Sequence, residues 1–218
     1  MIGALYMHQK IELEKPMEIE KKSFSIIESH LQDTMLQEAE YNILKRVIHT
    51  TADFDYVKNL TFSKGAVSIA LQALKNGADI ITDTNMAYAG INKHALQTLG
   101  GTVHCFMADA DVAKAAKERG ITRAMVSMEK ACALSKELIF AIGNAPTALI
   151  RLTELIQEQK IQPKLIIGVP VGFVNVIEAK NLILEGDTPY IVARGNKGGS
   201  NVAAAICNAL LYQLVSRD

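Results

Sequence analysis

The sequence lacks the features that mark several common classes of protein. Its three cysteines, Cys105, Cys132 and Cys207, are an odd number without a CxxC spacing, so they indicate neither a disulfide framework nor a zinc site. No apolar run reaches about 18 residues, and the N-terminus has no basic segment leading into a long apolar stretch. We therefore expect a cytoplasmic protein without a membrane-spanning helix or a secretory signal.

An excess of charge of either sign is also missing. The 23 Lys and Arg residues balance the 23 Asp and Glu residues, which argues against a nucleic-acid partner and against a basic membrane-facing patch. No two of the five histidines have metal-ligand spacing, so we expect no histidine-based metal site. The motif GxxxxGK(S/T) is absent, and the last glycine loop is spaced GxxGG rather than GxGxxG, so a nucleotide cofactor is not expected.

What the chain does contain is enough apolar sequence, 49% of its 218 residues, for one substantial core. Residues 1–15 are mixed in polarity and predict an N-terminal arm, whereas residues 16–218 predict a single α/β domain. Pro16 suits the first turn of a helix over 16–29, and apolar spacing predicts a second helix over 34–47.

Short apolar runs then alternate with amphipathic stretches along the rest of the chain. The predicted strands are 79–82, 102–107, 138–142, 165–167 and 190–193, and the predicted helices are 66–76, 93–99, 111–119, 128–135, 146–159, 174–184 and 200–215. Strands separated by helices imply a mainly parallel sheet with right-handed crossovers. The expected fold is therefore a single-domain, three-layer αβα arrangement.

Four loops follow predicted strands and are polar or rich in glycine: 83–86, 143–147, 168–173 and 194–200. Each alone is weak as a functional signal, because Gly and Pro commonly punctuate element ends. In a parallel sheet all four lie at the carboxyl edge, where open α/β folds bind ligands. The last loop carries two cations and three glycines and opens into a helix that Ser200 can cap, which favours a carboxylate or phosphate ligand.

His49 is the best acid–base candidate, because it lies at a helix end before the polar stretch Thr50 to Asp53. His104 lies within an apolar strand and is interpreted as a core residue with its polar atoms satisfied. The sulfur-containing residues between Met125 and Cys132 suggest core packing rather than a metal or cofactor site.

These segments resemble the precorrin-8X methylmutase family, including its cobalt-precorrin-8 branch. The resemblance rests on the following stretches: Lys22 to Ile27, Val47-Ile48-His49, Asp83 to Met86 with Gly90, GNAPTAL at 143–149, PVGFV at 170–174, and Arg194-Gly195 with Gly198-Gly199-Ser200. It covers nearly the whole chain, and the GNAPTAL and PVGFV segments together are specific. Residues 1–15 match poorly.

The resemblance implies an isomerase of cobalamin biosynthesis that moves a methyl group from C11 to C12 of the macrocycle without a redox change or an added cofactor. It implies that His49 protonates a ring nitrogen, and that the enzyme is a homodimer. Whether the substrate contains cobalt is left open, because the chemistry occurs at ring carbons. The substrate contacts expected from the matching positions are Ser23, Arg46, Asp83, Met86, Arg123, Asn144, Arg194, Gly198, Gly199 and Ser200.

Two other functions are consistent with the same residues. One is a corrinoid-binding or product-carrying protein without catalysis. The other is an enzyme for a phosphate ligand that uses Arg194 to Ser200 as an anion site.

Overall fold

The computed structural model describes residues 15–31 and 35–216. In chain order the elements are α1 (Pro16–His30), α2 (Glu38–Thr51), α3 (Tyr56–Asn59), β1 (Leu60–Phe62), α4 (Ala66–Lys75), β2 (Asp79–Thr82), α5 (Asn85–Gly90), α6 (Lys93–Thr98), β3 (Val103–His104), α7 (Ala110–Arg119), α8 (Arg123–Ala131), β4 (Leu138–Ile142), α9 (Pro146–Gln157), β5 (Leu165–Gly168), α10 (Val176–Leu184), β6 (Tyr190–Ala193) and α11 (Ser200–Leu211). The predicted arm, 1–15, lies outside the described residues except for Lys15.

A six-stranded sheet in the order β1-β6-β5-β4-β2-β3 forms the centre of the molecule. Only β1, at one edge, runs antiparallel to its neighbour, and the other pairs are parallel. All residues of β2, β4 and β5 are buried, as expected for parallel strands covered on both faces. The mainly parallel sheet predicted from the sequence is confirmed.

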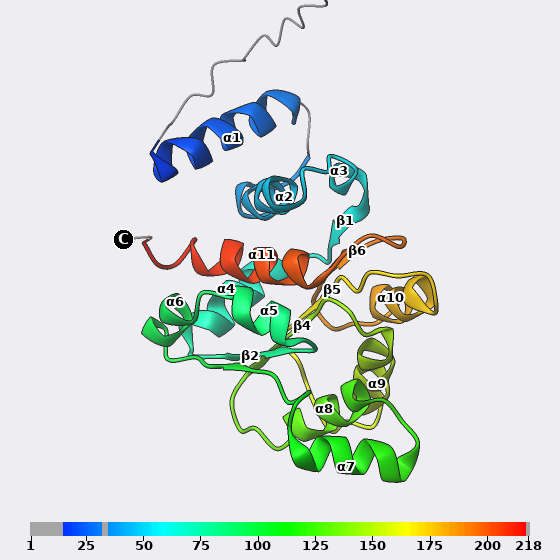
Figure 1. The fold of residues 1–218 in the computed structure, drawn as a ribbon. Helices are drawn as coiled ribbons and strands as arrows, with labels where there is room; N and C mark the ends of the chain where they lie inside the picture. Colours follow the sequence, from blue (N-terminus) through cyan, green and yellow to red (C-terminus); the bar gives the residue numbers. More distant parts are fainter. Residues whose placement is uncertain (1–14, 32–34, 217–218) are drawn as a thin grey trace, which may run out of the picture.

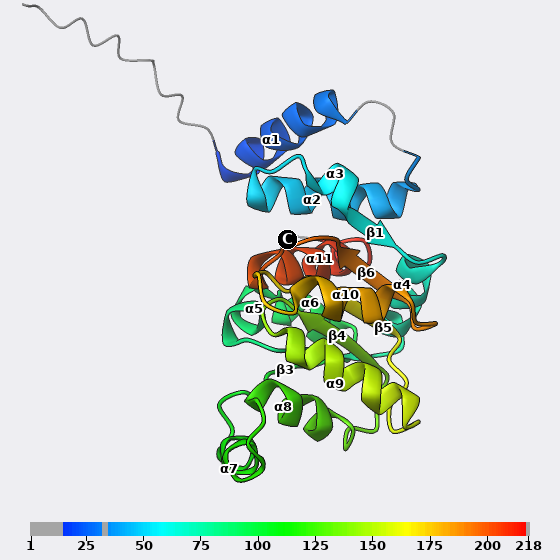
Figure 2. The same cartoon turned by 90° about the vertical axis from the view of Figure 1, so that its right-hand side faces the viewer.

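Alternate residues of the central strands pack into two separate hydrophobic cores. Ile139 and Ile167 pack with residues of α2, α4, α5, α6 and α11 on one face. Phe140 and Ile166 pack with residues of α8, α9 and α10 on the other. The period-two alternation of a strand therefore produces the predicted αβα layers. Beyond them, α1 lies outermost over α2, and α7 packs on α8 at the opposite end of the molecule (Figures 1 and 2).

The element boundaries differ from the predictions in several places. The second helix begins at Glu38 and continues to Thr51, so it includes His49 in its last turn. The strand expected over 102–107 has only two residues, and the helix expected over 128–135 spans Arg123–Ala131. Three short elements, α3, β1 and α5, were not predicted, because segments of three to six residues are too short to show a period.

Candidate active site

His49 lies in the last turn of α2, where α1 packs against it. The Ser23 hydroxyl oxygen lies 2.8 Å from His49 Nδ1, and the Phe24 ring meets the imidazole nearly edge-on, with the ring centroids 5.1 Å apart. The two side chains come from successive residues of α1, so this helix fixes both the plane and the hydrogen bond of the ring. A helix end thus presents a half-buried histidine whose orientation is set by its neighbours.

The hydroxyl partner suits a histidine that changes its charge. When the imidazole is neutral with its proton on Nε2, the Ser23 hydroxyl donates to Nδ1. When the imidazole is protonated, Nδ1–H donates and the same hydroxyl oxygen accepts. A carboxylate partner would instead favour the charged form. The Ser23–His49 pair can therefore retain its hydrogen bond while His49 releases and recovers a proton.

A cavity of about 400 Å³ opens beside this pair between α1 and the end of α2. Its wall is mostly apolar, and the lining includes Ile19, Ile26, Ile48 and Phe54 in addition to Ser23 and His49. Ile26 and Phe54 are 53% and 40% exposed, so apolar surface next to the histidine is accessible to a ligand. Lys22 also lines the cavity, and a mostly apolar wall with these few polar groups fits a large hydrophobic ligand better than a small ion.

The turn that follows His49 is joined to the last glycine loop by an ion-pair cluster. Lys197 Nζ lies 2.6 Å from a carboxylate oxygen of Asp53 and 2.6 Å from one of Asp55. The hydrogen bond from Lys197 lowers the pKa of Asp53, and the two carboxylates raise the pKa of Lys197. The glycine loop and the end of α2, distant in the sequence, therefore meet through Lys197.

Steric limits fix the shape of that loop, residues 194–199. A Cβ atom at Gly198 would overlap the carbonyl oxygen of Val169, so only glycine fits there. The Gly199 N–H donates to the same carbonyl oxygen at 2.8 Å, and the Arg194 N–H donates to the carbonyl oxygen of Asn59 at 2.8 Å. The glycines thus allow this loop to pack closely on loop 168–173. We call the four loops 83–86, 143–147, 168–173 and 194–200 the rim of the site.

Asp83 organises the next part of the rim. Its buried carboxylate accepts hydrogen bonds from the backbone N–H groups of Gly143, Asn144 and Ala145, at 2.9, 2.8 and 2.6 Å. Burial raises the pKa of Asp83, and the three backbone donors oppose this shift. The carboxylate therefore holds the loop after β4 in place, and its oxygens are occupied by backbone groups.

The start of α11 is packed tightly into the same rim. Gly143 lies so close to the Ser200 backbone that a Cβ atom would clash. The Ser200 hydroxyl pairs with the Thr84 hydroxyl at 2.7 Å and does not cap α11, which corrects the capping role expected from the sequence. The hydroxyl of Thr122, the N-cap of α8, lies 2.9 Å from the hydroxyl of Thr147 on α9. Three rim loops and the N-terminus of α8 are thus tied together.

The structure places most of the predicted substrate contacts on this rim, with different exposures. Met86, Arg123, Asn144 and Arg194 are exposed, whereas Asp83, Gly199 and Ser200 are buried and Gly198 is half-buried. Ser23 lies on α1, next to His49.

Arg46 is placed apart from the His49 cavity. Its guanidinium pairs with Glu20 at 2.9 Å and lies over the Phe24 and Tyr212 rings. It lines a second, smaller cavity of about 270 Å³ between α1, α2 and the end of α11. The side chain therefore contributes to the packing of α1 on α2.

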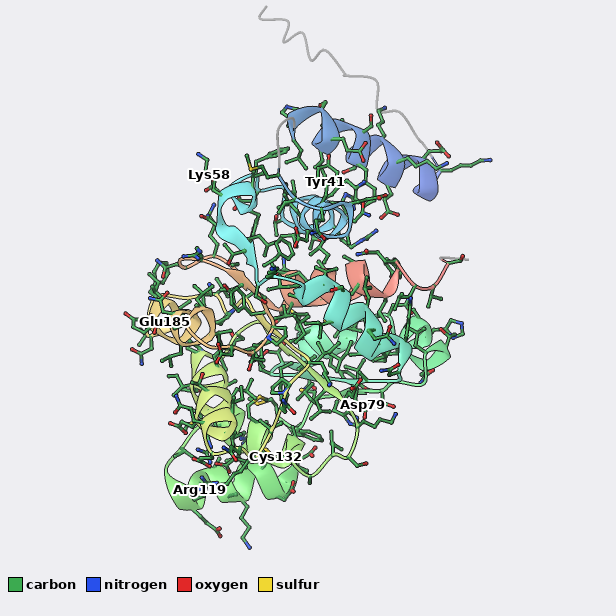
Figure 3. The ribbon with its side chains drawn as sticks, turned by 180° about the vertical axis from the view of Figure 1, so that it is seen from behind. Tyr41, Lys58, Asp79, Arg119, Cys132 and Glu185 are labelled. Atoms are coloured by element: carbon green, nitrogen blue, oxygen red, sulfur yellow. The ribbon has the colours of Figure 1, made fainter. Side chains whose placement is uncertain are left out.

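The residues that the sequence assigns to core packing lie elsewhere. The His104 Nε2 atom lies 3.0 Å from a carboxylate oxygen of Asp79, so its polar contact is satisfied. Met128 is fully buried in the core, and Cys132 lies at the opposite end of the molecule from α1 and α2 (Figure 3). Within the described ranges, no group of three or more His, Cys, Asp or Glu side chains is arranged to hold a metal ion.

Three residues that shape the site were not predicted as site residues from the sequence. Asp53 and Thr84 each contact a predicted rim segment. Lys180 is almost fully buried on the inner face of α10 and donates to two carbonyl oxygens of the glycine loop. A lysine on the same face of α10 as Val176, Ala179 and Ile183 was the one available signal.

Fold and site together define an α/β enzyme with one positioned histidine beside an apolar cavity and a rim suited to acidic groups. The family model for precorrin-8X methylmutase matches residues 18–213. The chain belongs to this family, which confirms the resemblance found in the sequence. None of the described helices is long and apolar enough to span a membrane.

Individual relatives agree with the family match. The chain is 45% identical to the cobalt-precorrin-8 methylmutase of Salmonella typhimurium, over 93% of this chain and 97% of the relative. It is 36% identical to the precorrin-8X methylmutase of Pseudomonas aeruginosa, over 88% and 93% of the two chains. A precorrin-8X methylmutase from Thermus thermophilus superposes with a TM-score of 0.81 at 37% identity, covering 88% of this chain and 95% of the other.

Proposed function

We propose that this chain moves the methyl group from C11 to C12 of precorrin-8X or cobalt-precorrin-8, giving hydrogenobyrinate or cobyrinate. Family membership supports the reaction. The observation that carries its assignment to this site is His49, held 2.8 Å from the Ser23 hydroxyl at the edge of an apolar cavity. No redox change is involved, and the reaction uses no added cofactor.

His49 acts as the proton donor and then as the acceptor. Protonating a nitrogen of the conjugated ring draws electron density from the carbon that the methyl group leaves, which lowers the barrier to the shift. After the shift the proton returns to the imidazole, so no proton is consumed. The Ser23 hydroxyl supports both charge states by switching from donor to acceptor.

The rim orients the substrate by binding the carboxylate side chains of the macrocycle. Arg123 and Arg194 are exposed, and guanidinium groups bind carboxylates through paired hydrogen bonds. Unpaired amides of the first turn of α11, which begins at Ser200, also favour an anion. Exposed Met86 offers an apolar contact on the same rim. Asp83 acts indirectly, by holding the backbone of the Asn144 loop.

A second copy of the chain completes the functional unit, a homodimer. The support is a pair of successive apolar side chains in loop 168–175: Phe173 and Val174 are 92% and 77% exposed. Burying such side chains against a partner is favourable, and large exposed apolar patches mark association sites. The cytoplasm is the proposed location, supported by three cysteines that form no disulfide.

Conversion of substrate with a ¹³C-labelled C11 methyl group tests the reaction. The wild-type protein should change the visible spectrum of the ring and move the label to C12, as followed by NMR. An unchanged chromophore, with or without cobalt in the ring, would contradict the proposal. The remaining alternative would then be a corrinoid-binding protein without catalysis. Sedimentation equilibrium tests the dimer, which should have twice the chain mass of 23.8 kDa.

A further inference from the structure

Lys180 is a buried cation that the reaction described above does not use. It lies on α10, only 1% exposed, in a helix whose other buried residues are Val176, Ala179 and Ile183. Transfer of an ammonium group into such surroundings is unfavourable unless its protons are satisfied. Burial alone lowers the pKa of Lys180 to about 8. A lysine that stays charged in this position at neutral pH needs stabilising partners nearby.

The partners of Lys180 are two carbonyl oxygens of the glycine loop. Its Nζ donates to the carbonyl oxygen of Gly195 at 2.7 Å and to that of Lys197 at 2.9 Å. Residue 197 is thus held from two sides, because its side chain pairs with Asp53 and Asp55 in the turn after His49. Lys180 therefore anchors the segment that links the rim to the end of α2.

The charge of Lys180 is not matched by a carboxylate in the part of the chain that the structure describes. Its only hydrogen bonds there are to neutral carbonyl groups, and no charged side chain contributes to its pKa shift. The elements packed on α10 are α9, β5 and β6. The nearby loop carries Arg194, which is exposed, and Lys197, which is paired with two aspartates. A buried, unmatched cation beneath this loop favours a bound anion.

We propose that Lys180 is a positioning residue for the substrate. By fixing the carbonyl groups of Gly195 and Lys197, it holds loop 194–199 so that Arg194 and the first amides of α11 receive substrate carboxylates. This inference rests on the proposed function, and it adds a residue that acts from behind the loop without touching the substrate. The ammonium group matters for both its hydrogen bonds and its charge.

The test compares Lys180→Met, which keeps the chain length but removes the donors and the charge, with Lys180→Arg, which keeps both. Lys75→Met, at an exposed position on α4, is the matched control. We expect Lys180→Met to raise KM and the product Kd about tenfold while kcat changes less than about threefold. Lys180→Arg should recover part of this loss, and Lys75→Met should behave as wild type.

Two further measurements separate positioning from a general loss of structure. Backbone amides of residues 195–200 should exchange hydrogen faster in Lys180→Met while those of the central strands keep wild-type protection. In the wild type, product affinity should fall as the pH rises through about 8, where Lys180 loses its charge, and the profile of Lys180→Met should be flat over that range. The wild-type profile remains informative even where the variant does not fold.

The outcomes distinguish the two proposals. Turnover by the wild type, together with unchanged KM, product Kd and loop exchange in folded Lys180→Met, would overturn the inference and leave the function intact. A wild-type product affinity that does not change between pH 7 and 9 would also overturn it. Product binding without turnover by the wild type would overturn the proposed function, and the binding and exchange measurements would still decide the role of Lys180.

Discussion

The Asp83 carboxylate tests how the rim of the site is built. It is 1% exposed and accepts three backbone N–H groups, from Gly143, Asn144 and Ala145. Asn at this position has the same shape but one acceptor oxygen, so at least one N–H group would face another donor. A hydrogen bond to a charged group contributes about 1.5–3 kcal/mol, and an unsatisfied buried donor adds a penalty of about 1–3 kcal/mol.

These contributions set the size of the expected effect. The neutral amide avoids the desolvation that raises the pKa of Asp83, which offsets part of the loss. We therefore expect Asp83→Asn to lower the free energy of unfolding by about 2–4 kcal/mol, less than the combined loss of about 2.5–6 kcal/mol because of this offset. At this chain length that corresponds to a decrease of about 4–16 °C in Tm.

Urea unfolding followed by circular dichroism measures the loss, with Asp111→Asn as the matched control. Asp111 is an exposed aspartate on α7 that pairs with Lys130, so its replacement should leave the urea midpoint close to that of wild type. Product affinity of Asp83→Asn should also fall, because Gly143 packs against Ser200. An Asp83→Asn protein as stable as the control would refute the assignment of the carboxylate as the support of this loop.

Further predictions address the histidine, the glycine loop and the buried lysine. Ser23→Ala should lower kcat about tenfold with little change in product Kd, because His49 loses the partner of its Nδ1 atom; an unchanged kcat would remove Ser23 from the mechanism. Gly198→Ala should lower the free energy of unfolding by about 1–3 kcal/mol through its clash with a carbonyl group, whereas Gly186→Ala, which has room for a Cβ atom, should change it little; equal urea midpoints would contradict this. The folded-state pKa of Lys180, about 8, is below its ordinary 10.5, so the unfolded state binds more protons between these two pH values. The free energy of unfolding of the wild type, relative to that of Lys180→Met, should therefore rise by up to about 3 kcal/mol from pH 8 to pH 10.5. A difference that stays constant over this range would refute the pKa shift.

The layers of the fold could be predicted because the longer elements have clear periods. Buried strands such as Leu138–Ile142 read as continuous apolar runs, and the helices between them have an apolar stripe. The antiparallel edge strand Leu60–Phe62 has only three residues and pairs with β6, which is more than 120 residues later. Pairing between strands so far apart in the sequence leaves no local sequence pattern from which it could be predicted.

The candidate site was predictable where a residue type carries its own chemistry. His49 and the exposed cations Arg123 and Arg194 stand out in the sequence for that reason. The parts that position them depend on contacts between distant segments: Lys197 meets Asp53 only after folding. The acceptor role of Asp83 is also invisible in the sequence, because its partners are backbone groups of another loop.

Single-turnover conversion by His49→Ala is the most direct test of the central claim, that His49 carries the proton in a methyl shift. The matched control is His94→Ala, at an exposed position on α6. The predicted result is product binding close to that of wild type in both variants, with the C11-to-C12 shift lost only in His49→Ala. A His49→Ala protein that rearranges the ring at the wild-type rate would contradict the account.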